Sequence, residues 1–155
     1  MANSLQQLRE QLISRAREVA QKDMTEKIKD VEIETIEKTV YDAYYPMMYE
    51  RRMSNNGLID RKNIDAQFTD NVNGISMYVT NNTRGNTKWI MGSTSGYIEH
   101  IIEEGIGYTW EYSDIYKQQP YPRPFTKNTI NDLKQNKQYV QALKNGLKKS
   151  GIDVK

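Results

Sequence analysis

His100, the single histidine of the chain, stands near two carboxylates. If Tyr97–Glu104 is helical, His100 shares one helix face with Glu103 and Glu104. Such a group could hold a metal ion or transfer a proton, but each use needs a third ligand or a nucleophile, and the sequence points to none. We expect a solvated histidine beside surface carboxylates and a protein that is not an enzyme. A hydrolase centred on His100 is the weakest of three functional alternatives.

Other motifs that bind metals or phosphates are incomplete. The run DNVNG resembles part of a calcium loop, but Thr69 stands where the first acid should be and no closing Glu follows, so we predict a turn. No phosphate-binding glycine loop or nucleophile elbow occurs. Cysteine is absent, which rules out disulfides, thiolate chemistry and the usual Cys/His zinc sites. We expect no cofactor and no metal.

The length of 155 residues indicates one domain, 1–155, large enough to bury a core. Its net charge of +2 does not require a polyanionic partner. No apolar run approaches the roughly 18 residues of a membrane helix. The first residues, MANSLQQLREQL, are polar and helical, unlike a secretory signal, so we expect cytoplasmic synthesis and no membrane partner.

Charge is unevenly distributed along the chain. From residue 117 onward two acids, Asp132 and Asp153, oppose nine basic residues, which gives +7; the basic residues are Lys117, Arg123, Lys127, Lys134, Lys137, Lys144, Lys148, Lys149 and Lys155. An acidic block precedes them: Glu99, Glu103, Glu104, Glu111 and Asp114. The basic helix could contact DNA phosphates, could be a solvated face favoured by the helix dipole, or could meet the acidic block of a neighbouring copy.

A helical arm is predicted over 1–45. Ser4 can cap it, and apolar residues recur at helical spacing in three sets: Leu5, Leu8, Leu12 and Val19; Ile13, Ala16, Ala20, Met24, Ile28 and Val31; Ile33, Ile36, Val40 and Tyr44. It is one bent helix or two consecutive helices, with Asp23 and Glu26 able to cap the second; VEIET could instead be a short strand. A helix of roughly 40 residues would be about 60 Å long. We expect a second subunit or a neighbouring protein to cover one of its apolar stripes, with Leu5, Leu8 and Leu12 as interface candidates.

The middle region, 46–125, is predicted to hold a small antiparallel β-sheet and a short helix. Ile75, Met77 and Val79 alternate with polar neighbours, and turns are predicted at 73–74 and 81–85. Tyr97–Glu104 is predicted to be helical, with Gly105 ending it, and 126–149 to be a C-terminal amphipathic helix. The fold class is therefore α+β.

Two loops have the composition of interfaces. Segments 81–89 and 111–118 are rich in Tyr, Asn and Trp and lack core periodicity, so we predict partner contacts there. The candidate residues are Trp89, Trp110, Tyr112 and Tyr116.

The segment PYPRPF forms a predicted structural corner before the last helix. Pro120, Pro122 and Pro124 restrict the backbone, Thr126 can cap the helix, and Phe125 is placed as a hydrophobic staple. We expect Phe125 to be buried against the sheet and Arg123 to have a carboxylate or carbonyl partner. A ligand for a proline-reading domain is disfavoured because the segment lies inside the domain.

The order of short motifs resembles that of tail-completion, or head–tail joining, proteins of tailed bacteriophages. Gly57-Leu58 is followed by a helix with Tyr97, Glu104 and Gly105 and then by Arg123-Pro124-Phe125. A further stretch is similar to the variant in phages and prophages of Gram-positive bacteria; it contains Tyr45, Pro46, Tyr49, Arg51 and Arg52. The resemblance covers about residues 40–147. It departs at 54–56, where Ser-Asn-Asn replaces the family's usual Pro-Val-Asp-Thr.

This resemblance implies a structural virion protein at the phage neck, without catalysis. It implies a ring around the DNA channel, with six copies as the first expectation because phage tails have sixfold symmetry. The implied partners are other copies of the chain, the tail terminator or tail tube, and head-completion or portal-side proteins, with DNA as passing cargo. Synthesis would take place in the cytoplasm of the host bacterium. The alternative is a DNA-binding accessory protein that uses the basic C-terminal helix.

Overall fold

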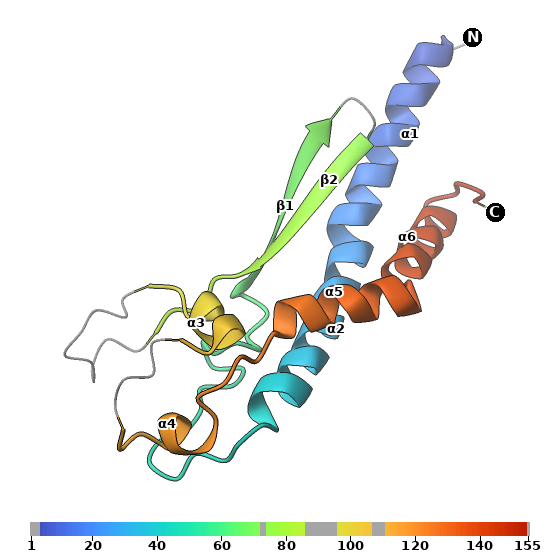
Figure 1. The fold of residues 1–155 in the computed structure, drawn as a ribbon. Helices are drawn as coiled ribbons and strands as arrows, with labels where there is room; N and C mark the ends of the chain where they lie inside the picture. Colours follow the sequence, from blue (N-terminus) through green and yellow to red (C-terminus); the bar gives the residue numbers. More distant parts are fainter. Residues whose placement is uncertain (1–3, 72–73, 86–95, 107–110, 155) are drawn as a thin grey trace.

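One long helix runs through the molecule in this computed structural model, which describes residues 4–71, 74–85, 96–106 and 111–154 (Figure 1). Its parts are α1 (Leu5–Val19), the π-helical η1 (Ala20–Met24), α2 (Thr25–Ile36) and the π-helical η2 (Glu37–Tyr41). The residues at the joints keep right-handed helical angles, so no new helix begins at Asp23. Val31–Thr35 lies within α2, and the strand alternative is wrong.

Ser4 begins this helix as predicted. Its Oγ accepts the Gln7 backbone N–H at 3.3 Å, while Gln7 Oε1 accepts the Ser4 N–H at 3.1 Å. This capping box satisfies two backbone donors that the first turn cannot pair internally.

The described strands form one antiparallel hairpin, β1 (Ile64–Asn71) and β2 (Gly74–Asn81). Ile64 pairs with Asn81 and Phe68 with Met77, so the predicted apolar alternation places Met77 and Val79 on one face. Thr25 Oγ1 lies 3.6 Å from Met77 Sδ, so this face packs on the long helix.

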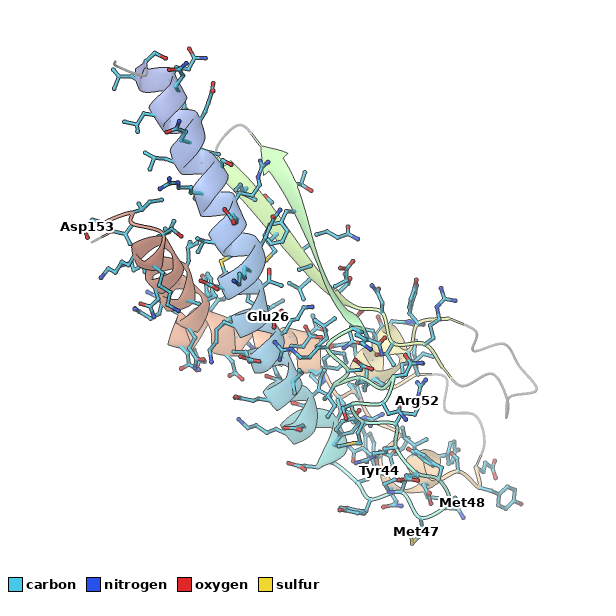
Figure 2. All side chains as sticks on the ribbon, turned by 180° about the vertical axis from the view of Figure 1, so that it is seen from behind. Glu26, Tyr44, Met47, Met48, Arg52 and Asp153 are labelled. Atoms are coloured by element: carbon cyan, nitrogen blue, oxygen red, sulfur yellow. The ribbon has the colours of Figure 1, made fainter. Side chains whose placement is uncertain are left out.

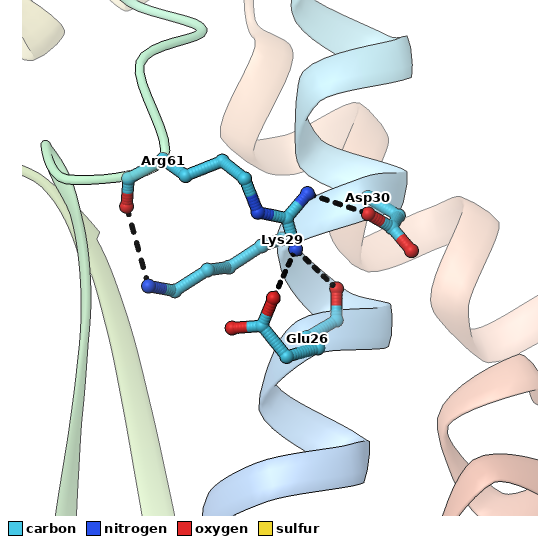
Figure 3. A network of polar contacts seen from close by, with 4 residues as sticks. All are labelled: Glu26, Lys29, Asp30 and Arg61. Atoms are coloured by element: carbon cyan, nitrogen blue, oxygen red, sulfur yellow. Dashed lines mark hydrogen bonds and ion pairs between the residues drawn. The ribbon is translucent and has the colours of Figure 1, made fainter.

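A polar network joins the start of the hairpin to α2 (Figure 3). Arg61 contacts Asp30 Oδ1 at 2.6 Å and Glu26 Oε2 at 2.5 Å, and Lys29 Nζ donates to the Arg61 carbonyl at 3.2 Å. Hydrogen bonds with Asp30 and then Glu26 raise the pKa of Arg61. These ion pairs are about half exposed, so the network orients the segment more than it stabilises the fold.

The C-terminal region contains two helices, which corrects the predicted single helix over 126–149. They are α5 (Phe125–Asn136) and α6 (Gln138–Lys149), separated by Lys137 with a left-handed φ of 48°. This break lets α5 pack on α2 while α6 crosses α1 and η1. At that crossing a Cβ on Gly146 would collide with the Val19 and Asp23 side chains, so glycine allows the close approach.

The core lies where the long helix meets the corner. Its buried members are Ile36, Val40, Tyr41, Leu58, Ile102 and Phe125. Phe125 is fully buried as predicted, but the hairpin contributes no member of this cluster, so the expectation of packing against the sheet is wrong. Ile36 and Val40, from the third apolar set of the long helix, are covered by the chain itself. This apolar stripe therefore needs no second subunit.

Two short helices flank the core. In α3 (Glu99–Glu104) Ile102 is buried, and Gly105 ends the helix with φ 65° as predicted. The second, α4 (Asp114–Gln118), replaces part of the predicted loop at 111–118. It begins where Ser113 Oγ accepts the Tyr116 N–H at 3.2 Å. The fold is therefore α+β: the C-terminal helices pack on the long helix, and a small hairpin lies beside it (Figure 1).

Candidate interaction site

The segment Tyr45–Tyr49 presents large apolar side chains to solvent at the end of the long helix. Tyr45 is 83% exposed, Met47 85%, Met48 61% and Tyr49 49%. Figure 2 shows Met47 and Met48 at the opposite end of the molecule from the start of α1. We call this segment the Met loop.

A buried carboxylate holds the Met loop in place. Asp114 is 4% exposed, and its Oδ2 accepts the backbone N–H groups of Met47 at 2.8 Å and Met48 at 2.6 Å. Gln118 Nε2 donates to the Tyr45 carbonyl at 3.1 Å. Both side chains come from α4, so this short helix fixes the backbone while the methionine side chains stay outside.

Arg51 binds the backbone that leads into the Met loop. Its Nη1 donates to the Tyr41 carbonyl at 2.6 Å and its Nη2 to the Tyr44 carbonyl. The guanidinium also lies 5.1 Å and 4.5 Å from the centres of the Tyr41 and Tyr44 rings. Arg51 thus satisfies backbone acceptors at the end of the long helix, where intrahelical partners run out.

The hydroxyl group of Tyr49, within the Met loop, meets that of Tyr44, which directly precedes the loop. Tyr44 and Tyr49 share a hydrogen bond, and burial raises the pKa of Tyr49 above its ordinary value.

A second exposed apolar surface lies at the start of the long helix. Leu5 is 87% exposed, Leu8 50%, Leu12 44% and Ile13 45%, and we call these four residues the α1 stripe. It continues the side of the helix on which Val19 and Ala20 are buried. The first turns of α1 extend past the hairpin and α6, so the body of the protein ends before the stripe does (Figure 1).

The motifs behind the sequence resemblance meet around the core. A Cβ on Gly105 would collide with the backbone of Tyr121 and Pro122, so the short helix and the corner need glycine at this position. The Arg123 N–H donates to the Ile102 carbonyl at 2.9 Å, and the buried Arg123 guanidinium lies 5.5 Å from the centre of the Tyr44 ring.

The other motif residues have different environments. Gly57 is buried and its Cβ would collide with the Met53 backbone, while Leu58 is 4% exposed in the core. Pro120, Pro124 and Pro46 are half-buried; Pro122, Tyr97 and Glu104 are exposed. Arg52 Nη2 donates to the Arg84 carbonyl, and the Arg84 guanidinium lies 5.1 Å from the centre of the Tyr97 ring.

The start of the corner helix is held differently from the prediction. Phe125 is the first residue of α5 and Thr126 the second, so Thr126 is not the N-cap. Its N–H donates to Glu103 Oε1 and its Oγ1 to Glu99 Oε1 at 3.2 Å. The carboxylates of α3 therefore satisfy the N-terminus of α5, where negative charge is favoured.

Among the predicted interface residues, Tyr112 and Tyr116 are 66% and 39% exposed. Trp89 and Trp110 lie outside the described residues. The beginning of the 81–89 loop is internal, because Asn81 and Thr83 are almost fully buried. Three members of the acidic block, Glu99, Glu103 and Asp114, already have partners within the chain.

A buried polar network was missed by sequence analysis. Asn81 Nδ2 donates to Glu32 Oε1 at 3.1 Å and to the Leu58 carbonyl at 2.9 Å, and Thr83 Oγ1 donates to Asn81 Oδ1 at 2.6 Å. Burial, with smaller contributions from Glu99 and Glu103, raises the pKa of Glu32 to about 7. Asn81, a polar residue at the end of β2, was the one signal in the sequence for this network. Glu32 gave none, because a glutamate on a helix is usually a solvent-exposed residue.

No metal centre is formed by the described part of the chain, where no group of three or more His, Cys, Asp or Glu side chains comes together. His100 is exposed, as predicted. None of the helices in the described ranges is long and apolar enough to cross a membrane.

Comparison with known proteins assigns this α+β chain to a phage- or prophage-type family. The chain belongs to the YomN family, whose model matches residues 4–149. This agrees with the phage character that the motif order indicated. No curated protein and no solved structure matches the chain.

Proposed function

We propose that this chain is a structural virion protein of the phage neck, which completes the tail and joins it to the head as part of a ring around the DNA channel. Membership of a phage-type family supports this role. So does the order of motifs along the chain, which resembles that of neck proteins. The proposed partners are further copies of the chain, six in the first instance, the tail terminator or tail tube, and head-completion or portal-side proteins. DNA passes as cargo, and the chain has no catalytic role.

The observation that carries the proposal is that residues from three of the resembling segments meet in the core. Leu58, Ile102 and Phe125 share a core, and Gly105 receives the backbone of the proline corner. Here each supports the position of the next.

Cryo-electron microscopy of purified phage particles tests this role. We expect a closed ring of the chain between tail tube and portal assembly, and a gene deletion should yield heads and tails that do not join. Particles that lack the chain, or that hold a single copy, would overturn the proposal.

The alternative role is a DNA-binding accessory protein. Its support is the run of exposed lysines on α5 and α6: Lys127, Lys134, Lys148 and Lys149. Affinity for duplex DNA should then fall steeply between low and physiological salt, because each phosphate contact releases counterions. A neck protein should bind DNA weakly at every salt concentration.

A further inference from the structure

We propose that the Met loop of one copy docks on the α1 stripe of a second copy, so that the chain associates head to tail. This inference identifies the contact between copies in the proposed ring and, in that respect, rests on the proposed function. The two surfaces themselves are properties of the isolated chain.

The first argument is that one copy cannot cover its own stripe with its own loop. The helix from Leu5 to Tyr41 is roughly 55 Å long at about 1.5 Å per residue. The α1 stripe lies at its start and the Met loop follows its end (Figures 1 and 2). Any contact between the two surfaces is therefore intermolecular.

The second argument concerns chemistry. The stripe is the apolar face of an amphipathic helix, with leucines three and four residues apart. Methionine side chains are unbranched and polarizable, and they adapt to the irregular surface of such a helix. Met47 and Met48 therefore offer a suitable contact for Leu5, Leu8 and Leu12.

The third argument concerns rigidity. The Met47 and Met48 amides are both held by the buried Asp114 carboxylate, and Arg51 donates to the Tyr41 carbonyl at the end of the helix that precedes the loop. An exposed apolar segment with a fixed backbone loses little conformational entropy when it binds. A loop that was merely a connection would not need this anchoring.

The fourth argument is charge. Next to the Met loop along the chain, and at α4 which anchors it, the exposed ionic side chains are Asp42, Glu50, Glu111 and Lys117; Arg51 and Arg52 are half-buried and donate to backbone carbonyl groups. Around the stripe, α1 carries three arginines and two glutamates, and Arg15 donates to the Ser150 carbonyl at 3.3 Å, which brings the lysine-rich end of α6 alongside. The two surfaces therefore carry opposite excess charge, which favours a loop-to-stripe contact over loop-to-loop contact.

A contact between two different surfaces leaves one loop and one stripe unused in every dimer. It therefore propagates until the rotation between copies closes a ring. Stripe-to-stripe pairing would instead stop at a dimer.

Disulfide cross-linking tests this arrangement, because the chain has no cysteine of its own. We expect a variant with both Leu8→Cys and Met48→Cys to give a ladder of dimers and larger species under mild oxidation, in concentrated chain or in assembled particles. Each single variant should remain monomeric, and a mixture of the two single variants should give dimers only. Dimers from Leu8→Cys alone would show stripe-to-stripe pairing, and dimers from Met48→Cys alone loop-to-loop pairing; either result overturns the proposal.

A matched pair of charge variants provides a second measurement. Added to the double-cysteine chain, Leu12→Glu should abolish the ladder, whereas Ile130→Glu on α5 should leave it unchanged, since the two side chains are similarly exposed at 44% and 46%. Equal ladders from both variants, or no ladder from the double-cysteine chain in solution and in particles, would also overturn the docking. If the chain forms a neck ring but this cross-link does not appear, the contact is refuted and the neck role stands. If the cross-link appears but the chain is absent from particles, the contact stands and the neck role is refuted.

Discussion

The Glu32 carboxyl group accepts a hydrogen bond from Asn81 Nδ2 at 3.1 Å inside the protein, 6% exposed, where the hairpin meets α2. This carboxyl group is protonated more readily than one in water because burial disfavours its charged form. Folding and the ionisation of Glu32 are therefore linked.

The first prediction concerns the pH dependence of stability. The pKa of Glu32 rises from 4.5 to about 7 on folding, so the folded state binds more protons than the unfolded state between these values. The stabilisation that Glu32 gives by binding a proton is fully present below pH about 4.5. It is lost as pH rises through about 7, which lowers the free energy of unfolding by on the order of 3 kcal/mol. Glu32→Gln should unfold at higher denaturant concentration than wild type at pH 8 and should flatten this dependence.

The control for this experiment is Glu34→Gln, because Glu34 is exposed on the same helix. Its stability profile against pH should follow that of wild type. A Glu32→Gln profile with the wild-type slope would show that the Glu32 carboxyl group does not titrate in this way. The pKa of Glu99 is also raised by burial, so some slope should remain in every variant.

Phe125→Ala should lower the free energy of unfolding by about 3–5 kcal/mol, because it removes a fully buried ring from the core. Chemical denaturation measures the effect. Ile130→Ala on the same helix is the control, and it should cost much less because Ile130 is 46% exposed. If the two variants lowered the free energy of unfolding equally, Phe125 would not be a central residue of the core.

Gly105→Ala should be far more destabilising than Gly151→Ala, although both glycines have positive φ, 65° and 80°. A left-handed conformation costs an alanine on the order of 1–2 kcal/mol at either position. Open space surrounds a Cβ on Gly151, whereas one on Gly105 collides with the backbone of the proline corner. The difference in melting temperature between the two variants measures the collision alone, and no difference would show that the corner can move aside.

Asp114→Ala should loosen the Met loop without unfolding the protein. It leaves the Met47 and Met48 amides without their charged acceptor, a hydrogen bond of a kind typically worth about 1.5–3 kcal/mol. Hydrogen exchange should become faster at these two amides, and head-to-tail cross-linking should weaken. Glu111→Ala, an exposed neighbour, should leave the exchange of both amides as in wild type.

Several features followed from the sequence because they depend on neighbours along the chain. Helical spacing predicted the long helix, alternation around Met77 predicted the face of the hairpin strand, and the position of Phe125 predicted its burial. Gly105 was correctly predicted to end its helix because a left-handed residue there favours glycine. Each of these predictions used only residue spacing or local backbone preference.

Tertiary packing decided the rest. Lys137 breaks the last helix although neither glycine nor proline marks the place, because α5 and α6 pack on different parts of the long helix. Asp114 reaches the Met47 amide across 67 positions of sequence, and Glu32 reaches Asn81 across 49. Spacing shows that a helix has several apolar faces, but only the packed structure shows that Ile36 is covered and Leu5 is not. Burial is a property of the whole assembled surface, and for that reason no local pattern determines it.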